Sequence, residues 1–500
     1  MRSFNLKDLK EKTIRGGFAR LAAQGANFVL RVGSLMVLAR LLVPADFGLV
    51  GMVTAITGVL QLFRDFGLSA AAIQRPTVTE EQISTLFWIN MLVGALLGFL
   101  CVGLAPAVAA FYHEPRLVAV TSVLGAGFLF NAAGIQHGAI LQRQLRFSAL
   151  GVINTIAWTA AVAVGVIGAI AGFGYWALVA MTVTVPLAVT IGCWAATGWV
   201  PRLPHKRVGI RSMMRFGGAL TLNGVVGYVA SNFDKILIGR FWGAEAIGIY
   251  GRAYQLSNIP TSNLNSAAGD VAFSVLSRLQ DNPTRFRSYF LKGYSLVLAL
   301  TIPATVGCAL FADDLISVVL GRKWTAVVPI LRLLAPTILV SATVGPMWWL
   351  LMSLGMIRRI VKLGLLYAPV MIMGYVIGLP YGPKGVAFAY SCVLMLLAIP
   401  LIAWAVHGTA VSFGDILLAA SKFLVSGAVA GGLAFGTRLA YGQLLPPFPR
   451  LVLEMGVLLA TFIPMLLFAA GQKQLYFDLF RSLKASFSGK EKTLVSAEVQ

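Results

Sequence analysis

Long apolar blocks recur along the whole 500-residue chain, and short polar segments separate them. A helix needs roughly 20 apolar residues to cross a bilayer, and scanning for such blocks predicts about fourteen membrane-spanning helices. Their centres lie near residues 30, 58, 98, 128, 160, 186, 228, 258, 300, 338, 370, 395, 427 and 460. The blocks near 58, 228 and 258 carry polar stripes. The pattern therefore predicts an all-α, polytopic membrane protein.

Polar side chains line one face of the first predicted span, residues 18–42. Arg20, Gln24, Asn27 and Arg31 follow one another at spacings of four, three and four, which places them on one stripe of a helix. A charge at mid-membrane depth costs several kcal/mol or more unless it faces water or a partner. The stripe therefore predicts a polar, positively charged interior that receives an anionic substrate. Helix–helix hydrogen bonding, with Arg20 reaching the inner surface, is the alternative interpretation.

The second, seventh and eighth predicted spans also carry polar residues at helical spacing. Arginine suits a pyrophosphate because the guanidinium group donates two parallel hydrogen bonds, whereas amides, hydroxyls and aromatic rings suit sugars. Asp234 has two interpretations, because it either neutralises a nearby arginine or binds a coupling cation or proton. The residues of these three spans that we expect to contact substrate are Gln61, Arg64, Asn223, Asp234, Tyr250, Arg252, Tyr254 and Asn265.

Other chemistry-bearing residues indicate no catalytic centre. His137, beside Gln136 near the inner end of the fourth span, is interpreted as a hydrogen-bonded structural residue rather than a proton carrier. The four cysteines fall inside apolar spans without a CxxC pair. The sequence contains no metal-binding, ATP-binding or nucleophile motif, so we expect no cofactor. The energy source is then an ion gradient (H⁺ or Na⁺), the membrane potential or consumption of the product.

The charge of the chain reports its topology. Lys and Arg number 40 against 18 Asp and Glu, which gives a net charge of +22, although 58% of residues are hydrophobic. The mean hydropathy of +0.82 excludes an ordinary soluble domain. Most of the basic residues fall on one side of the predicted spans, a pattern that places both termini in the cytoplasm. We attribute the basic excess to topology and anionic lipid rather than to nucleic acid.

An internal repeat relates two parts of the chain. Residues 39–52 read ARLLVPADFGLVGM and residues 239–252 read GRFWGAEAIGIYGR. Six predicted spans separate the two copies, so both have the same orientation and predict parallel lobes related by an axis along the membrane normal. The shared offset aligns Arg40 with Arg240, Gly48 with Gly248, and Gly51 with Gly251.

The repeat and the charge pattern together predict six segments in the chain. They are a cytoplasmic surface helix over 1–15, an N-terminal six-span lobe over 16–199, a basic cytoplasmic linker over 200–215, a C-terminal six-span lobe over 216–407, two extra spans over 408–470, and a cytoplasmic tail over 471–500.

Five sequence blocks carry a family resemblance: ARLLVPADFGLVGM, DFGLSAAAIQRPTVTEEQISTLFWIN, ILQRQLRFSALGVIN, AGFGYWALV and SNFDKILIGRFWGAEAIGIYGRAYQLSNIP. They resemble the polysaccharide flippase family of the multidrug/oligosaccharidyl-lipid/polysaccharide exporter superfamily. The resemblance runs over residues 14–405 and favours the exopolysaccharide, lipopolysaccharide and teichuronic-acid branch. It implies two six-helix lobes around a central cavity, usually with two extra helices.

The resemblance also implies a function. The implied substrate is an undecaprenyl-pyrophosphate-linked oligosaccharide repeat unit, which is turned over from the inner to the outer leaflet of the bacterial cytoplasmic membrane. The implied partners are membrane lipids and the polymerase and export proteins of the same pathway. Two alternatives remain: a cation-coupled multidrug exporter of the same superfamily, which prefers acidic cavity residues, and a polysaccharide polymerase or ligase, which is expected to carry a large outside loop.

Overall fold

The computed structural model describes the chain in four stretches, residues 25–64, 78–204, 211–441 and 444–469. Within these stretches the regular structure is helical and no strand occurs. The predicted surface helix over 1–15 and the predicted tail over 471–500 lie outside the described residues.

Residues 25–41 form the first described helix. The helices that follow are α2 (Pro44–Leu62), α4 (Glu80–Tyr112), α5 (Leu117–Arg143), α6 (Phe147–Ile170), α7 (Tyr175–Thr197), α8 (Arg211–Ser277), α9 (Pro283–Leu310), α10 (Ala312–Val319), α11 (Val327–Ser353), α12 (Ile357–Gly378), α13 (Gly382–Val406), α14 (Phe413–Tyr441) and α15 (Pro447–Pro464). Short turns of helix, η1 (Arg322–Trp324), η2 (Leu379–Tyr381) and η3 (Met465–Ala469), complete the series. Each predicted span centre lies in one of these helices, so the predicted fold class is confirmed.

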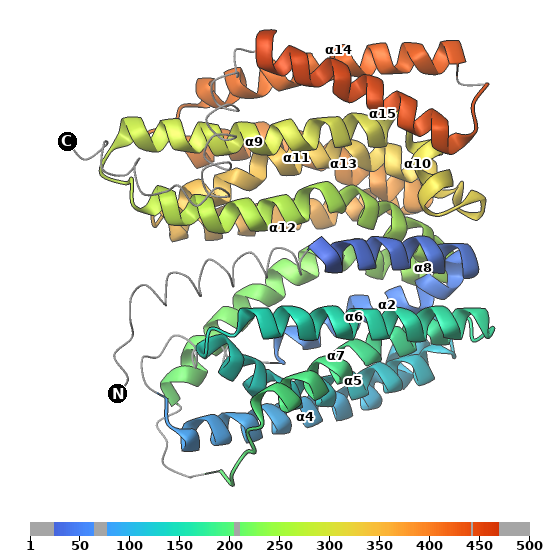
Figure 1. Ribbon diagram of the computed structural model, residues 1–500, viewed down its shortest axis with the longest axis vertical. Helices are drawn as coiled ribbons and strands as arrows, with labels where there is room; N and C mark the ends of the chain where they lie inside the picture. The colour runs from blue at the N-terminus through green and yellow to red at the C-terminus, as the bar shows by residue number, and fades with distance from the viewer. Residues whose placement is uncertain (1–24, 65–77, 205–210, 442–443, 470–500) are drawn as a thin grey trace. The chain divides into compact units, whose positions relative to one another are not determined.

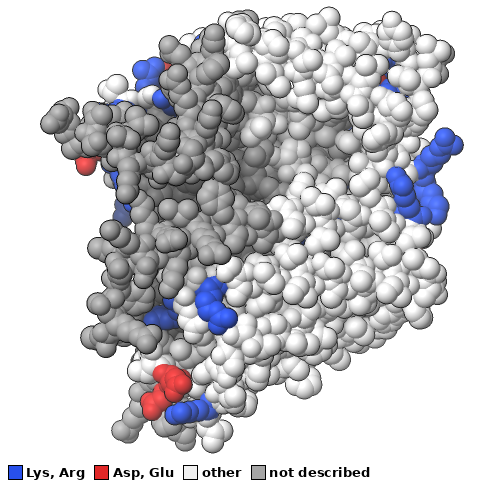
Figure 2. All heavy atoms as spheres, in the orientation of Figure 1, with Lys and Arg blue, Asp and Glu red and all other residues white. Residues whose placement is uncertain are grey.

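Ten segments of the described chain are long and apolar enough to cross a membrane, and one of them, Ile357–Val406, contains both α12 and α13. On the face shown in Figure 2, the described surface is mostly uncharged, and its Lys, Arg, Asp and Glu side chains lie mainly toward the ends of the helices. This distribution suits helices whose middle portions face hydrocarbon. The chain is therefore a multi-pass membrane protein.

The 67-residue helix α8 is divided at Gly243, whose φ of 80° and ψ of −174° are not helical. A positive φ is inexpensive only for glycine, so this residue permits the break. The two arms of α8, residues 211–242 and 244–277, correspond to the seventh and eighth predicted spans. Both arms carry polar stripes, and α8 is not among the ten apolar segments.

The described chain forms two compact units. The first comprises the described residues between 25 and 252 with Val319–Thr325 and Ala368–Val386, and the second comprises Ala253–Val318, Ala326–Tyr367 and the described residues between 387 and 469. The lobe boundaries expected from the repeat stay a prediction.

Small residues bring the helices of the first unit together. In this unit α4, α5, α6 and α7 run side by side (Figure 1). The buried residues of α6 are Ala157, Ala161 and Gly165, spaced four apart on one stripe. Lipid is as apolar as a leucine side chain, so helices in a membrane associate through close packing of this kind rather than through the hydrophobic effect.

A reciprocal glycine contact joins α2 to the second arm of α8 within the first unit. A Cβ atom added to Gly48 would overlap the carbonyl oxygen of Ala244, and one added to Gly248 would overlap the carbonyl oxygen of Pro44. Pro44 and Ala244 each lie four residues before the glycine of their own helix and are themselves 200 residues apart. Gly48 thus contacts Ala244, and its repeat equivalent Gly248 contacts Pro44, which is the repeat equivalent of Ala244. A reciprocal contact of this kind indicates a two-fold axis. The contact therefore supports the repeat predicted from the sequence.

An extended apolar core lies in the second unit. α9 packs against α11 and α14, and α14 packs against α15 (Figure 1). Six aromatic side chains of this core are at most 2% exposed: Phe286, Phe290, Tyr294, Phe311, Phe423 and Phe462. This core attaches the two C-terminal helices α14 and α15 to α9.

Replacement of Gly48 or Gly248 by alanine is expected to lower the free energy of unfolding by about 3 kcal/mol or more, because a backbone carbonyl has no rotamer with which to yield. Gly51→Ala and Gly251→Ala are matched controls from the same repeat. The added methyl group meets only an isoleucine side chain at 3.8 Å in the first control, and no atom within 4 Å in the second. Thermal unfolding in detergent measures all four variants, and equal losses in all four would contradict the contact.

Candidate functional site

A buried hydrogen bond fastens the two arms of α8 to each other. The Tyr250 hydroxyl donates to Oδ2 of Asp234 at 2.7 Å, and both residues are fully buried. Asp234 lies on the first arm and Tyr250 on the second, so the bond closes the hairpin that turns at Gly243. A hydrogen bond to a carboxylate is stronger than one between neutral groups, and burial raises the cost of losing it. Asp234 therefore has a structural contact in this state.

A tyrosine side chain fixes the first arm of α8 against α2, and a second polar contact lies within that arm. The Tyr228 hydroxyl donates to the backbone carbonyl of Thr54 at 3.0 Å, and its oxygen occupies the space that a side chain at Gly58 would need. On the same arm, Lys235 Nζ donates to Oδ1 of Asn232 at 2.7 Å. The lysine beside Asp234 is thus held by an amide on its own helix.

Arg252 is a half-buried cationic residue at this junction. Its guanidinium carbon lies 4.7 Å from the centre of the Phe47 ring, an arrangement in which the negative face of the ring attracts the cation. Its Nε atom is buried and has no hydrogen-bond partner among the described residues. The Nε–H group of Arg252 can therefore donate a hydrogen bond to an anion.

Arg31 forms a similar contact on another helix of the first unit. Its guanidinium carbon lies 4.4 Å from the ring centre of Trp158 on α6, and its side chain is exposed. One turn earlier, the amide oxygen Oδ1 of Asn27 is buried without a hydrogen-bond partner among the described residues. The part of the predicted stripe that the structure describes therefore consists of an exposed cation over an aromatic ring and a neighbouring amide.

The remaining predicted site residues are placed less completely. Arg20 and Gln24 lie outside the described residues, and Asn223 and Asn265 lie in α8 at positions whose side chains are not described. Gln61 is exposed in the last turn of α2, and Arg64 is half-buried just after the end of α2. The ring of Tyr254 lies 6.1 Å from the ring of Tyr390. Within the predicted set, Asp234 and Tyr250 contact each other, and the assignment to a substrate site stays a prediction.

His137 is hydrogen-bonded as predicted, and its structural role stays a prediction. The residue is fully buried, and its Nε2 lies 3.2 Å from the carbonyl oxygen of Trp199. Its ring stacks on Trp194 with centroids 4.4 Å apart, and the Trp199 ring meets it at 5.1 Å.

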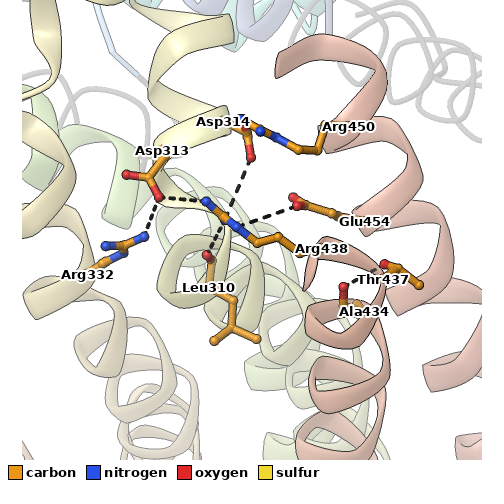
Figure 3. Close-up of polar contacts among 9 residues, drawn as sticks. All are labelled: Leu310, Asp313, Asp314, Arg332, Ala434, Thr437, Arg438, Arg450 and Glu454. Carbon is orange, nitrogen blue, oxygen red and sulfur yellow. Dashed lines mark hydrogen bonds and ion pairs between the residues drawn. The ribbon is translucent and has the colours of Figure 1, made fainter. Parts of the chain in front are cut away.

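Sequence reasoning missed an ion cluster that joins α14 and α15 to the ends of α9, α10 and α11 (Figure 3). Arg438 lies at its centre and donates to the carbonyl oxygen of Leu310 at 2.9 Å and to Asp313 at 3.0 Å. The side chains of Asp314 and Glu454 in this cluster are 1% exposed. The α14–α15 ion cluster consists of Asp313, Asp314, Arg332, Arg438, Arg450 and Glu454.

Two of the arginines share the acidic groups of this cluster. Arg438 also lies 3.8 Å from Asp314 and 4.0 Å from Glu454, while Nε of Arg450 donates to Asp314 at 2.9 Å. Three acids and three arginines balance formally, so the buried charges are compensated. The available sequence signal was Glu454, an acidic residue inside the last apolar span that required a cationic partner.

The fold resembles that of known membrane transporters. The inward closed conformation of the lipid II flippase MurJ superposes with a TM-score of 0.72 at 13% identity, over 92% of this chain and 99% of that one. An inward-facing multidrug transporter of the MATE family superposes with a TM-score of 0.62 at 14% identity, over 78% of this chain and 97% of that one. This chain therefore shares its fold with these two transporters.

The sequence defines the family more narrowly. Residues 37–329 match the model of a family described as polysaccharide biosynthesis protein, which is more than half of the chain, so this protein belongs to that family. The teichuronic acid biosynthesis protein TuaB of Bacillus subtilis is 32% identical over 59% of this chain and 62% of its own length. The lipopolysaccharide biosynthesis protein WzxC of Escherichia coli is 26% identical over 78% of this chain and 80% of its own length.

Removal of the Tyr250 hydroxyl tests whether the hydrogen bond to Asp234 holds the two arms of α8 together. Tyr250→Phe leaves the buried Asp234 carboxyl without its donor, and we expect a loss of about 1–3 kcal/mol in the free energy of unfolding. Tyr381→Phe is the control, because Tyr381 is 78% exposed. Equal thermal midpoints for Tyr250→Phe and wild type would show that the bond contributes nothing.

Removal of Arg438 tests the α14–α15 ion cluster. Arg438→Ala takes the nearest cation from Glu454 and a shared one from Asp314, and we expect a loss of about 3–5 kcal/mol in stability. The control is Arg116→Ala in the loop between α4 and α5. Arg116 is half-exposed, and its hydrogen bonds hold the pKa of the Glu114 carboxyl below its usual value. An exposed pair of this kind contributes about 0–1 kcal/mol. A smaller loss for Arg438→Ala than for the control would contradict the buried cluster.

Proposed function

We propose that this protein is a flippase that moves an undecaprenyl-pyrophosphate-linked oligosaccharide repeat unit from the inner to the outer leaflet of the cytoplasmic membrane. The family match over residues 37–329 carries the proposal. The names of several relatives agree with it, among them the succinoglycan biosynthesis transport protein ExoT of Rhizobium meliloti, 22% identical over 65% of this chain. The fold shared with the lipid II flippase MurJ suits the same task.

The chemistry of such a substrate requires cations for the diphosphate and neutral polar groups for the sugars. We assign Arg31, Arg64 and Arg252, with Arg20, to the diphosphate, because a guanidinium group matches phosphate oxygens with paired hydrogen bonds. Arg31 and Arg252 lie over the faces of aromatic rings and form no ion pair with an acid among the described residues, so their N–H groups can donate to phosphate oxygens. The sugars are assigned to Gln24, Asn27, Gln61, Asn223, Tyr254 and Asn265.

The proposed movement is alternating access. The repeat relates α2 to the second arm of α8, and their reciprocal glycine contact is a joint that such a movement would open and close. The Asp234–Tyr250 bond makes the two arms of α8 move together. A flippase forms no covalent bond with its substrate. An ion gradient of H⁺ or Na⁺, the membrane potential or downstream use of the repeat unit drives the cycle.

The proposed cellular setting follows from the charge pattern and the relatives. Both termini lie in the cytoplasm, and the partners are membrane lipids together with the polymerase and export proteins of the same polysaccharide pathway. The relatives act in the synthesis of teichuronic acid and lipopolysaccharide by their names, so a cell-surface polysaccharide is the proposed end product.

A knockout and complementation experiment tests the function and the residue assignment. In cells that lack the protein, repeat units are expected to accumulate in the inner leaflet; accumulation in the outer leaflet would indicate the polymerase or ligase alternative. Arg31→Ala combined with Arg64→Ala is expected to abolish polymer export at normal membrane abundance. Arg322→Ala combined with Lys323→Ala serves as a charge-matched control at the short turn η1.

Two further outcomes of this experiment separate the hypotheses. Full polymer export by the Arg31 and Arg64 double variant would contradict the assignment of these residues to the diphosphate, and the proposed flippase function would still stand. Resistance to cationic dyes conferred by the wild-type protein, with normal polymer export in the knockout, would favour the multidrug exporter whose fold this chain shares.

A further inference from the structure

The seam between α4 and α5 has a well-defined antiparallel register. A Cβ atom added to Gly94 would overlap that of Ala132, and one added to Gly98 would lie 3.2 Å from the carbonyl oxygen of Gly125. At one end of the seam, the rings of Phe87 and His137 lie 6.0 Å apart. These contacts bring the two backbones close along most of the seam.

This register places two amide side chains opposite each other. Asn90 lies between Phe87 and Gly94 on the packed stripe of α4, and Gln136 lies one turn beyond Ala132 on the packed stripe of α5. Asn90 is 0% exposed and Gln136 is 1% exposed. Both the amide nitrogen and the amide oxygen of each residue lack a hydrogen-bond partner among the described residues. A buried amide without partners costs several kcal/mol, so this pair requires an explanation.

His137 adds a third polar group to the same end of the seam. The carbonyl oxygen of Trp199 only accepts hydrogen bonds, so the Nε2 atom that faces it carries the ring proton of the neutral imidazole. Nδ1 is then an acceptor, and it is buried without a partner among the described residues. The fully buried imidazole therefore needs a donor on its Nδ1 side.

The mixture of donors and acceptors defines the class of ligand. The two amide oxygens and Nδ1 accept, whereas the two amide nitrogens donate. A metal cation satisfies only the acceptors and an anion satisfies only the donors, while a water molecule does both and makes about three hydrogen bonds in a buried site. We infer that Asn90, Gln136 and His137 form an internal site that binds water within the first unit.

Aromatic rings close this site toward the end of the seam. The Trp194 ring stacks on His137, and the rings of Trp199 and Phe87 meet its edges. Trp194 is itself held by a hydrogen bond from its Nε1 to the carbonyl oxygen of Ala133 at 2.8 Å. The bound water is therefore retained rather than exchanged freely, and it acts as a bridge between α4 and α5. This inference does not depend on the proposed function.

Hydroxyl-radical footprinting with X-rays tests the site, because radiolysis of a bound water oxidises the side chains that touch it. In the purified wild-type protein, we expect oxidation of His137. Trp324 is the control for a buried ring, because it is 0% exposed and its Nε1 already donates to the carbonyl oxygen of Ala39. In Asn90→Leu combined with Gln136→Leu, the His137 signal is expected to fall to the Trp324 level. A wild-type His137 as unreactive as Trp324, or an unchanged signal in the double variant, would overturn the inference.

A double-mutant cycle gives an independent measure. Asn90→Leu or Gln136→Leu alone removes one side of the bridge and leaves the other amide unsatisfied, so each is expected to lower the thermal midpoint. The double variant is expected to lose less than the sum. Asn154→Leu combined with Asn90→Leu is the control and should be additive, because the Asn154 amide bonds to its own helix at Leu150. Additive losses for the Asn90 and Gln136 pair would contradict a shared bridge.

Discussion

Close approach of helix backbones through small residues is the constraint on which this structure depends. Lipid supplies no hydrophobic force between helices, so contact area must come from short separations. The clearest case is the crossing of α2 with the second arm of α8, where Gly48 and Gly248 face carbonyl oxygens of the opposite helix. Cα–H groups this close to carbonyl oxygens also form weak hydrogen bonds. The same rule shapes the Gly94 seam of α4 and the alanine stripe of α6.

Tight seams leave little room for polar side chains, and the described residues accommodate polar groups in four ways. Asp234 is satisfied by Tyr250 inside α8, whereas Arg31 and Arg252 lie over aromatic rings. The α14–α15 ion cluster gathers acids and arginines at one end of the second unit (Figure 3). The seam of α4 and α5 holds amides that have no hydrogen-bond partner among the described residues. Polar groups that pair with other protein groups stabilise the fold, whereas polar groups without such a pairing remain available to a substrate.

Much of the fold could be predicted because hydropathy is a strong local signal. Each expected span centre falls in a helix, and the 200-residue offset between Gly48 and Gly248 is visible in the sequence as well as in the contact between α2 and α8. The α14–α15 ion cluster could not be predicted, because its members come from four helices and pair only in three dimensions. Helical spacing places Asp234 on a polar stripe but does not reveal that Tyr250 lies opposite it across a hairpin. Periodicity reports the face of a helix, whereas the identity of its neighbour depends on the packing.

The neutrality of the α14–α15 ion cluster has an electrical consequence. Its three carboxylates and three guanidinium groups sum to zero formal charge, so a transmembrane voltage exerts no net force on them as a rigid group. Arg31 and Arg252 have no acid within ion-pair distance among the described residues, and each carries a full charge for the field to act on. Such a charge gains or loses about 2.3 kcal/mol per 100 mV that it crosses. Voltage thus acts on the charges of Arg31 and Arg252 and exerts no net force on the α14–α15 ion cluster.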